Sequence, residues 1–140
     1  MEDMLEDLIR DILNEENMLM SVSTGGAVIE MRINNDLPFK VRENWMTIGD
    51  NNGPCHMHIN KKEVKEVRFI KEEKQSRISY SIRLMNTRGD RLIAAFFTKM
   101  YDDNGSPVKE RIERYESIFK KYGSKEVIPL QVEVKKEFEG

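Results

Sequence analysis

Cysteine, histidine and tryptophan are scarce in this chain, whose 140 residues include one cysteine, two histidines and one tryptophan. A single cysteine cannot form an internal disulfide, which excludes the disulfide-stabilised class of small secreted domains. No stretch approaches the ~20 consecutive apolar residues of a membrane-spanning helix. The acidic start of the sequence differs from the basic start of a secretory signal peptide. We therefore expect a cytoplasmic protein that does not insert into a membrane.

Charge of one sign is not in excess either. The chain has 25 acidic and 23 basic residues, which give a net charge of −2. General binders of nucleic acid or of anionic membranes normally show a clear basic excess, so we expect neither kind of partner. The length is that of one domain with its own core. We expect residues 1–140 to form this domain, with an N-terminal helix in 1–20, a sheet and closing helix in 21–123, and a strand or tail in 124–140.

Hydrophobic periodicity predicts two helices and a set of antiparallel strands. Apolar residues recur at helical spacing in 2–16, and again in a stretch that starts with Ser106 as cap and Pro107 and ends at Gly123. Alternation and turn residues between the helices predict strands at 27–33, 37–42, 45–48, 55–59, 65–73, 76–85 and 91–98. Residues 126–138 alternate as well and predict a strand in the sheet or on a partner chain. The predicted fold class is α+β with an antiparallel sheet.

Some positions within this pattern carry specific expectations. Residues 21–24 are expected to end the first helix, and the following glycine pair predicts a turn. Proline in 37–42 predicts an edge strand, and the nearly continuous apolar run in 91–98 predicts a central one. The lone tryptophan, Trp45, is expected to lie in the core, because large aromatic side chains are usually well buried.

The chemically richest stretch is 53–60, which contains the only cysteine and both histidines. A glycine–proline turn precedes a short predicted strand, and side chains alternate between the two faces of a strand. His56 and His58 therefore share one face, about 6.5–7 Å apart along the strand. Cys55, Met57 and Ile59 share the other face, where we expect them in the core.

The histidine pair supports more than one kind of site. Two imidazoles on one face can meet a single bound group, and a His-x-His pair with a carboxylate can hold a transition metal. The sequence offers Glu30, Glu43 or Asp50 as that carboxylate without a reason to choose among them. No nucleophile elbow, phosphate loop or paired carboxylates predict catalysis by side chains. Any enzyme activity is therefore expected to belong to a bound cofactor.

The order and spacing of several segments resemble a known family. The relevant segments, between residues 21 and 122, are AVIE at 27–30 with Leu37-Pro38 downstream, His58-Ile59 before a lysine-rich turn, VKEVRFIK at 64–71, YSIRLMNTRGD at 80–90, AFF at 95–97 and the closing helix. In these the chain resembles the haem-iron-utilisation proteins of the ChuX/HutX type, which are related to HemS-type proteins. The resemblance implies an antiparallel, split-barrel-like sheet flanked by helices, a homodimer, and binding of haem or a related tetrapyrrole for transfer or breakdown.

The resemblance also implies a role for one histidine. His58 falls where the family has a histidine in a Gly-His-Ile context, implicated in haem ligation, so it is the expected axial ligand of the haem iron. A second family histidine falls near Ser23 or Thr24, where this chain has none. His56 falls where relatives carry a small residue, and it is expected at most as a second ligand or a water-mediated partner.

We therefore expect an intracellular haem carrier or storage protein in which a single imidazole ligates the iron. Two alternatives stay open. One is a metal-binding protein that uses His56 and His58 without a porphyrin. The other is a dimeric interaction module with no small-molecule ligand.

Overall fold

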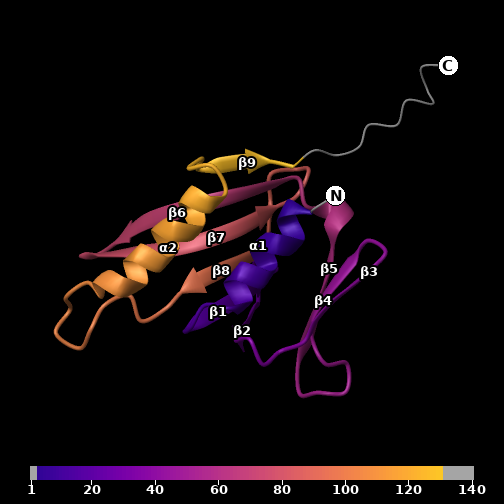
Figure 1. Ribbon diagram of the computed structural model, residues 1–140, viewed down its shortest axis with the longest axis horizontal. Helices are drawn as coiled ribbons and strands as arrows, with labels where there is room; N and C mark the ends of the chain where they lie inside the picture. The colour runs from indigo at the N-terminus through magenta and orange to yellow at the C-terminus, as the bar shows by residue number, and fades with distance from the viewer. Residues whose placement is uncertain (1–2, 131–140) are drawn as a thin grey trace.

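A computed structural model describes residues 3–130 and has the expected α+β class, with antiparallel sheets and helices near both ends of the chain (Figure 1). Within this range none of the helices is long and apolar enough to cross a membrane. The elements in chain order are α1 (Met4–Leu13), β1 (Met18–Ser23), β2 (Val28–Ile33), β3 (Phe39–Arg42), β4 (Trp45–Gly49), β5 (His56–Asn60), the 3-10 turn η1 (Lys61–Glu63), β6 (Glu66–Lys74), β7 (Arg77–Met85), β8 (Arg91–Phe97), α2 (Lys109–Lys121) and β9 (Val127–Pro129).

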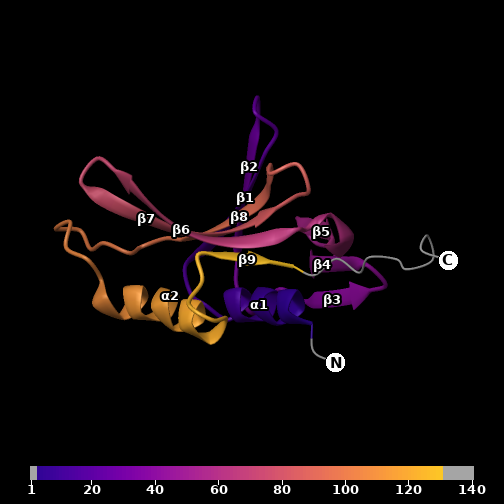
Figure 2. The same ribbon diagram turned by 90° about the horizontal axis from the view of Figure 1, so that it is seen from above.

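The strands form a six-stranded sheet, in the order β2-β1-β8-β7-β6-β9, and a three-stranded sheet, in the order β3-β4-β5. All strand pairs are antiparallel. Both helices lie against the same face of the six-stranded sheet, and the three-stranded sheet stands at one end of the molecule, beside α1 (Figure 2). The predicted positions of β8 as a central strand and of β3 as an edge strand are confirmed.

Helix α1 joins the two sheets through one apolar face. Its buried side chains are Leu5, Leu8, Ile9, Ile12 and Leu13, the stripe that the periodicity predicts. Asp3 caps the helix, because its carboxylate accepts a hydrogen bond from the backbone N–H of Glu6. Lys61, just after β5, donates to the carboxylates of Asp3 and Glu6 at 2.9 and 2.5 Å. The hydrogen bond to Glu6 raises the pKa of Lys61, and these contacts hold α1 against the end of β5.

Strand β1 is the main departure from the predicted elements. Met18–Ser23 does not end the first helix but forms a full strand, while α1 stops at Leu13. The strand pairs with β2 on one side and β8 on the other, so that Met20 faces both Met31 and Ala95. Its stability comes from these long-range partners, and the local sequence carries little strand signal. The glycine pair after it forms the predicted turn to β2.

The start of α2 also differs from the prediction. The helix begins at Lys109 with Val108 at the cap position and no side-chain cap. Ser106 instead donates its backbone N–H to Asp102, and Pro107 forms an isolated bridge with Tyr101. The loop therefore continues further than its capping residues suggest. At the other end of the chain, β9 pairs with β6, and the remainder of the predicted 126–138 strand lies outside the described residues.

Candidate functional site on the three-stranded sheet

The three-stranded sheet has an inner face that packs on the core and an outer face that is open. Met46, Ile48 and Ile59 point inward and are buried. Because side chains alternate along each strand, the residues between them form the outer face. Cross-strand pairing arranges this outer face in rungs: Arg42 faces Trp45, Lys40 faces Thr47, Thr47 faces His58, and Gly49 faces His56.

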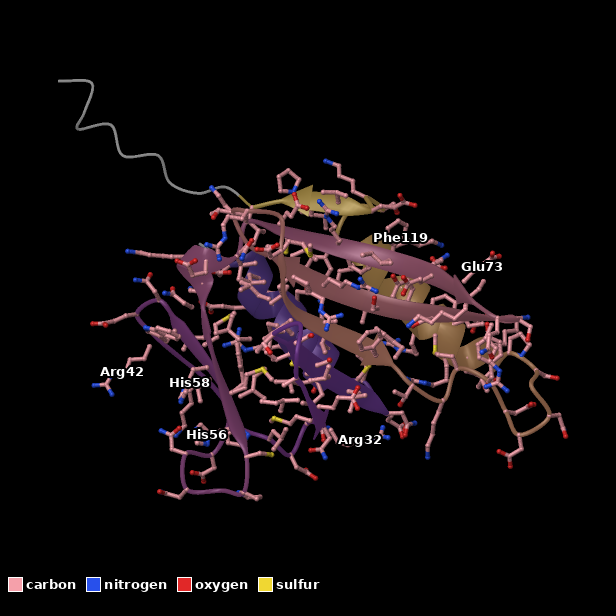
Figure 3. All side chains as sticks on the ribbon, turned by 180° about the vertical axis from the view of Figure 1, so that it is seen from behind. Arg32, Arg42, His56, His58, Glu73 and Phe119 are labelled. Carbon is pink, nitrogen blue, oxygen red and sulfur yellow. The ribbon has the colours of Figure 1, made fainter. Side chains whose placement is uncertain are left out.

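Both histidines lie on this outer face, as the alternation predicts, and both are exposed. Figure 3 shows them beside β5, with Arg42 at the same end of the molecule. Their ring centroids are 5.0 Å apart and the ring planes meet at 69°. The two rings therefore lean together to less than the spacing of about 6.5–7 Å between alternate strand residues.

Thr47 distinguishes the two imidazoles. Its Oγ1 lies 2.8 Å from Nδ1 of His58. A histidine that ligates a metal through Nε2 keeps its proton on Nδ1 and donates it to a neighbouring acceptor, and a hydroxyl oxygen can accept such a proton. In the tautomer in which Nδ1 of His58 donates to Thr47, Nε2 carries the lone pair that a metal ion needs. Within residues 3–130 the ring of His56 has no hydrogen-bond partner of this kind.

Gly49, which pairs with His56 at the end of β4, is buried and must be glycine. Its φ of +97° lies in the region that favours glycine, and a Cβ there would come within 2.8 Å of the carbonyl oxygen of Cys55 and 3.0 Å of Cα of His56. No larger residue fits without moving β5. The glycine therefore lets the end of β4 pair closely with β5 beside His56.

The prediction that Trp45 lies in the core is wrong, because 47% of its surface is exposed. The alternation explains the difference: Met46 and Ile48 take the inward phase of β4, so Trp45 joins Thr47 on the outer face. An indole is thereby placed on the rung next to His58, beside the exposed cations Lys40 and Arg42. Sequence reasoning missed these groups, since only the pairing of β3, β4 and β5 brings them together.

Of the other residues in the histidine stretch, some pack in the core and one is exposed to solvent. Ile59 is buried and Met57 packs against the core, as predicted. Cys55 precedes the first residue of β5 and is exposed, so its predicted burial is wrong. The chain leaves the strand ladder at this point, and the alternation that would turn the thiol inward no longer holds.

The expected carboxylate partner of a histidine metal site is not found. Among the residues that the structure describes, no group of three or more histidine, cysteine or acidic side chains is placed to hold a metal ion. Glu30 lies on β2 in the other sheet, and Glu43 lies in the β3–β4 turn. Asp50 accepts a backbone hydrogen bond from Asn52 in the β4–β5 loop. The two histidines thus lack a third protein ligand from this part of the chain.

Two cavities lie away from the histidines. One, of about 270 Å³, is lined by Phe69, Tyr115 and Phe119 among others, between β6 and α2. The other, of about 310 Å³, lies at the far end of β7 and β8. Neither includes a residue of the three-stranded sheet, so a large ligand of His58 would rest on an open face.

Comparison with known proteins shows to which family this chain belongs. A protein-family model matches residues 6–123, most of the chain. The chain belongs to the ChuX/HutX-like family. No curated protein sequence matches it significantly.

Solved structures of ChuX/HutX-like and related proteins share the fold at low sequence identity. The heme binding protein ChuX superposes with a TM-score of 0.70 and 14% identity, covering 86% of this chain and 73% of ChuX. A protein from Agrobacterium tumefaciens superposes with a TM-score of 0.62 and 22% identity, covering 86% of this chain and 66% of the other protein. Holo-PhuS, a heme-binding protein from Pseudomonas aeruginosa, superposes with a TM-score of 0.59 and 14% identity. The match covers 81% of this chain but only 32% of PhuS.

Proposed function

We propose that this protein binds haem, or a related tetrapyrrole, on the outer face of its three-stranded sheet, with His58 as the axial ligand of the iron. It then acts in the cytoplasm as a carrier or store in haem-iron utilisation. The observation that carries the proposal is the exposed imidazole of His58, held at Nδ1 by Thr47 on the open face of a ChuX/HutX-like fold. Haem-binding relatives of the same fold, ChuX and PhuS, support it.

The residues present fit the chemistry of haem. A single histidine suffices as an axial ligand, and Nε2 of His58 is the free nitrogen for this bond. Trp45 offers an exposed aromatic surface on the neighbouring rung, and apolar contact is what a porphyrin ring requires. Lys40 and Arg42 lie two strands from β5, roughly 10 Å away, where they can pair with the carboxylates of haem. When bound, the haem supplies the iron chemistry, and these side chains hold and orient it.

The test is a titration of the purified protein with haem, followed at the Soret band. We expect saturation at one haem per chain. Absence of saturable binding would contradict the proposal. If divalent metal ions then bound without porphyrin, the histidine pair itself would be the site.

Thr47 provides a second test of the ligand geometry. Thr47→Val keeps the shape of the side chain but removes the acceptor for Nδ1–H of His58, so we expect haem affinity to fall about 10–100-fold, as for other partners of ligating histidines. Thr47→Ser keeps the hydroxyl and is expected to bind like the wild type. The measurement is the same Soret titration on the three proteins. Equal affinity of the valine and serine variants would show that Thr47 does not position the ring.

A homodimer is part of the proposal. No helix of residues 3–130 covers the face of the six-stranded sheet opposite α1 and α2 (Figure 2). The β1–β2 hairpin presents Val28 and Ile29 with 60% and 68% of their surface exposed. Apolar side chains this open at a hairpin tip favour contact with a second chain. Sedimentation equilibrium tests this, and a monomer mass at micromolar concentration would contradict it.

Transition-metal binding by the histidine pair remains the second candidate function. The separation of 5.0 Å between the two ring centroids favours it, because both imidazoles lie within reach of one ion. The lack of a third ligand from the described residues speaks against a tight site. Calorimetric titration of the wild type and of His56→Ala with Zn²⁺ and Ni²⁺ separates the two candidates. Chelation needs both rings and should be lost in the variant, whereas haem binding needs His58 alone and should be kept.

A further inference from the structure

The cavity of about 310 Å³ at the end of β7 and β8 combines an apolar floor with a cationic rim. The start of β7 and the end of β8, which contribute to its lining, lie at the opposite end of the molecule from the three-stranded sheet (Figure 1). Ile78, Phe97 and Met100 form the floor, and the last two are 4% exposed. Lys74, Arg77 and Lys99 form the rim, and no acidic side chain lines the cavity.

Two of these cations have no carboxylate partner. Within residues 3–130 neither Arg77 nor Lys99 makes an ion pair. Lys74 pairs only with exposed Glu72, at 3.6 Å, and Glu72 is shared with Arg83. Two of the three cations at the rim are therefore left without an acidic partner among the residues that the structure describes.

Arg77 is held in place without an ion pair. Its guanidinium carbon lies 5.0 Å from the centroid of the Tyr101 ring, in a cation–π contact. The tyrosine is itself fixed, because its hydroxyl accepts a hydrogen bond of 2.8 Å from the backbone N–H of Ile78. That bond uses the hydroxyl as an acceptor, so its own proton can donate to a ligand. The cavity thus contains a positioned guanidinium and a positioned hydroxyl.

Lys99 occupies a strained backbone conformation at the cavity edge. Its φ is +58°, a left-handed value that non-glycine residues adopt rarely. The neighbours on both sides are fixed: the N–H of Thr98 donates to the carbonyl of Asn17 at 2.9 Å, and the carbonyl of Met100 accepts from the N–H of Val108 at 2.8 Å. These two hydrogen bonds fix the backbone that carries the Lys99 side chain at the edge of the cavity.

We propose that this cavity binds a small organic anion with a phosphate or carboxylate group on an apolar body. The anionic group meets Arg77, Lys99 and Lys74, and the apolar body lies on Phe97 and Met100. The volume is at the low end of the range for small-molecule sites, about 300–1,000 Å³, so the ligand is the size of a substituted aromatic ring. Glu73 and Glu72, opposite Ile78 and Ser79 across the β6–β7 ladder, are exposed and not part of the lining.

The test uses phenyl phosphate as the probe, with phenol and inorganic phosphate as its two halves. In ¹H–¹⁵N NMR spectra of the protein without haem, we expect phenyl phosphate to shift the amides of 77–79 and 97–101 saturably. Inorganic phosphate should bind more weakly, and phenol should not shift them. Benzoate is the probe for a carboxylate group, and it is expected to shift the same amides saturably.

Lys99→Gln is expected to weaken binding of phenyl phosphate about tenfold, because one charged hydrogen bond is lost. Lys62→Gln, the same change at an exposed position in η1, is the matched control and should bind like the wild type. Equal weakening in both variants would reduce the effect to general charge attraction and overturn the proposal, as would shifts that do not saturate. Because the histidines take no part, these outcomes are independent of haem binding.

Discussion

Replacing His58 by alanine is expected to weaken haem binding by about 100-fold or more, since loss of the ligand itself should cost at least as much as loss of its hydrogen-bonded partners. The shifted Soret band of a histidine-ligated haem should disappear with it. The reason is that His58 is the imidazole whose Nδ1 is held by Thr47, which leaves Nε2 for the iron. The measurement is the Soret titration of the variant beside the wild type.

His56→Ala is the matched control, because it removes the other exposed imidazole from the same strand. The variant is expected to keep the wild-type spectrum and to lose only the contact between the two rings. If both variants bound haem like the wild type, the ligand would lie elsewhere or the binding would be adsorption. If His56→Ala alone lost the band, the assignment of the two histidines would be reversed.

Tyr115→Ala is expected to lower the free energy of unfolding by about 3–5 kcal/mol, the cost of removing a large aromatic side chain from a core. Tyr115 is 1% exposed, at the centre of the contact between α2 and the six-stranded sheet. Its ring packs edge-to-face against Phe69, Tyr80 and Phe97, with centroids 5.9, 5.1 and 5.0 Å away. Since domains of this kind are stable by only about 5–15 kcal/mol, the change removes a large share of the total.

Tyr115→Phe separates the ring from the hydroxyl. The hydroxyl donates to the backbone carbonyl of Ser81 at 3.0 Å, and burial raises the pKa of Tyr115, so the group remains a donor. Loss of this bond is expected to cost about 1 kcal/mol. Urea unfolding of the three proteins, followed by tryptophan fluorescence and circular dichroism, measures both values. An alanine variant within 1 kcal/mol of the wild type would contradict the central role assigned to this ring, on the scale expected for core residues.

The strand that holds the histidines is predictable because its signal is local. Alternation in β5 alone separates the faces of His56 and His58 from that of Ile59, and Gly53-Pro54 marks the preceding turn. The stripe of α1 and the long alternating strand β7 are predictable for the same reason. In each case the apolar residues of one continuous segment recur with the period of a strand, two residues, or of a helix, 3.6 residues.

The rest of the site depends on register, which the sequence does not display. Trp45 lies in one phase of β4 and Met46 and Ile48 in the other, and only the burial of the latter two in the core decides that Trp45 points outward. The hydrogen bond between Thr47 and His58 requires β4 and β5 to pair in one specific register. Strand β1 is not predictable for a similar reason. Its own residues show no strand pattern, and it is a strand because it pairs with β2 on one side and β8 on the other.

The most direct measurement is ¹H–¹⁵N NMR of the protein with ¹⁵N-labelled histidine, recorded with and without ferric haem. The chain has only two histidines, and the spectrum of His56→Ala assigns them. We predict that the ring signals of His58 move to the strongly shifted, broadened region of an iron-bound imidazole, while those of His56 stay in the normal range. Saturation with haem while the signals of His58 remain in place would contradict ligation by this residue.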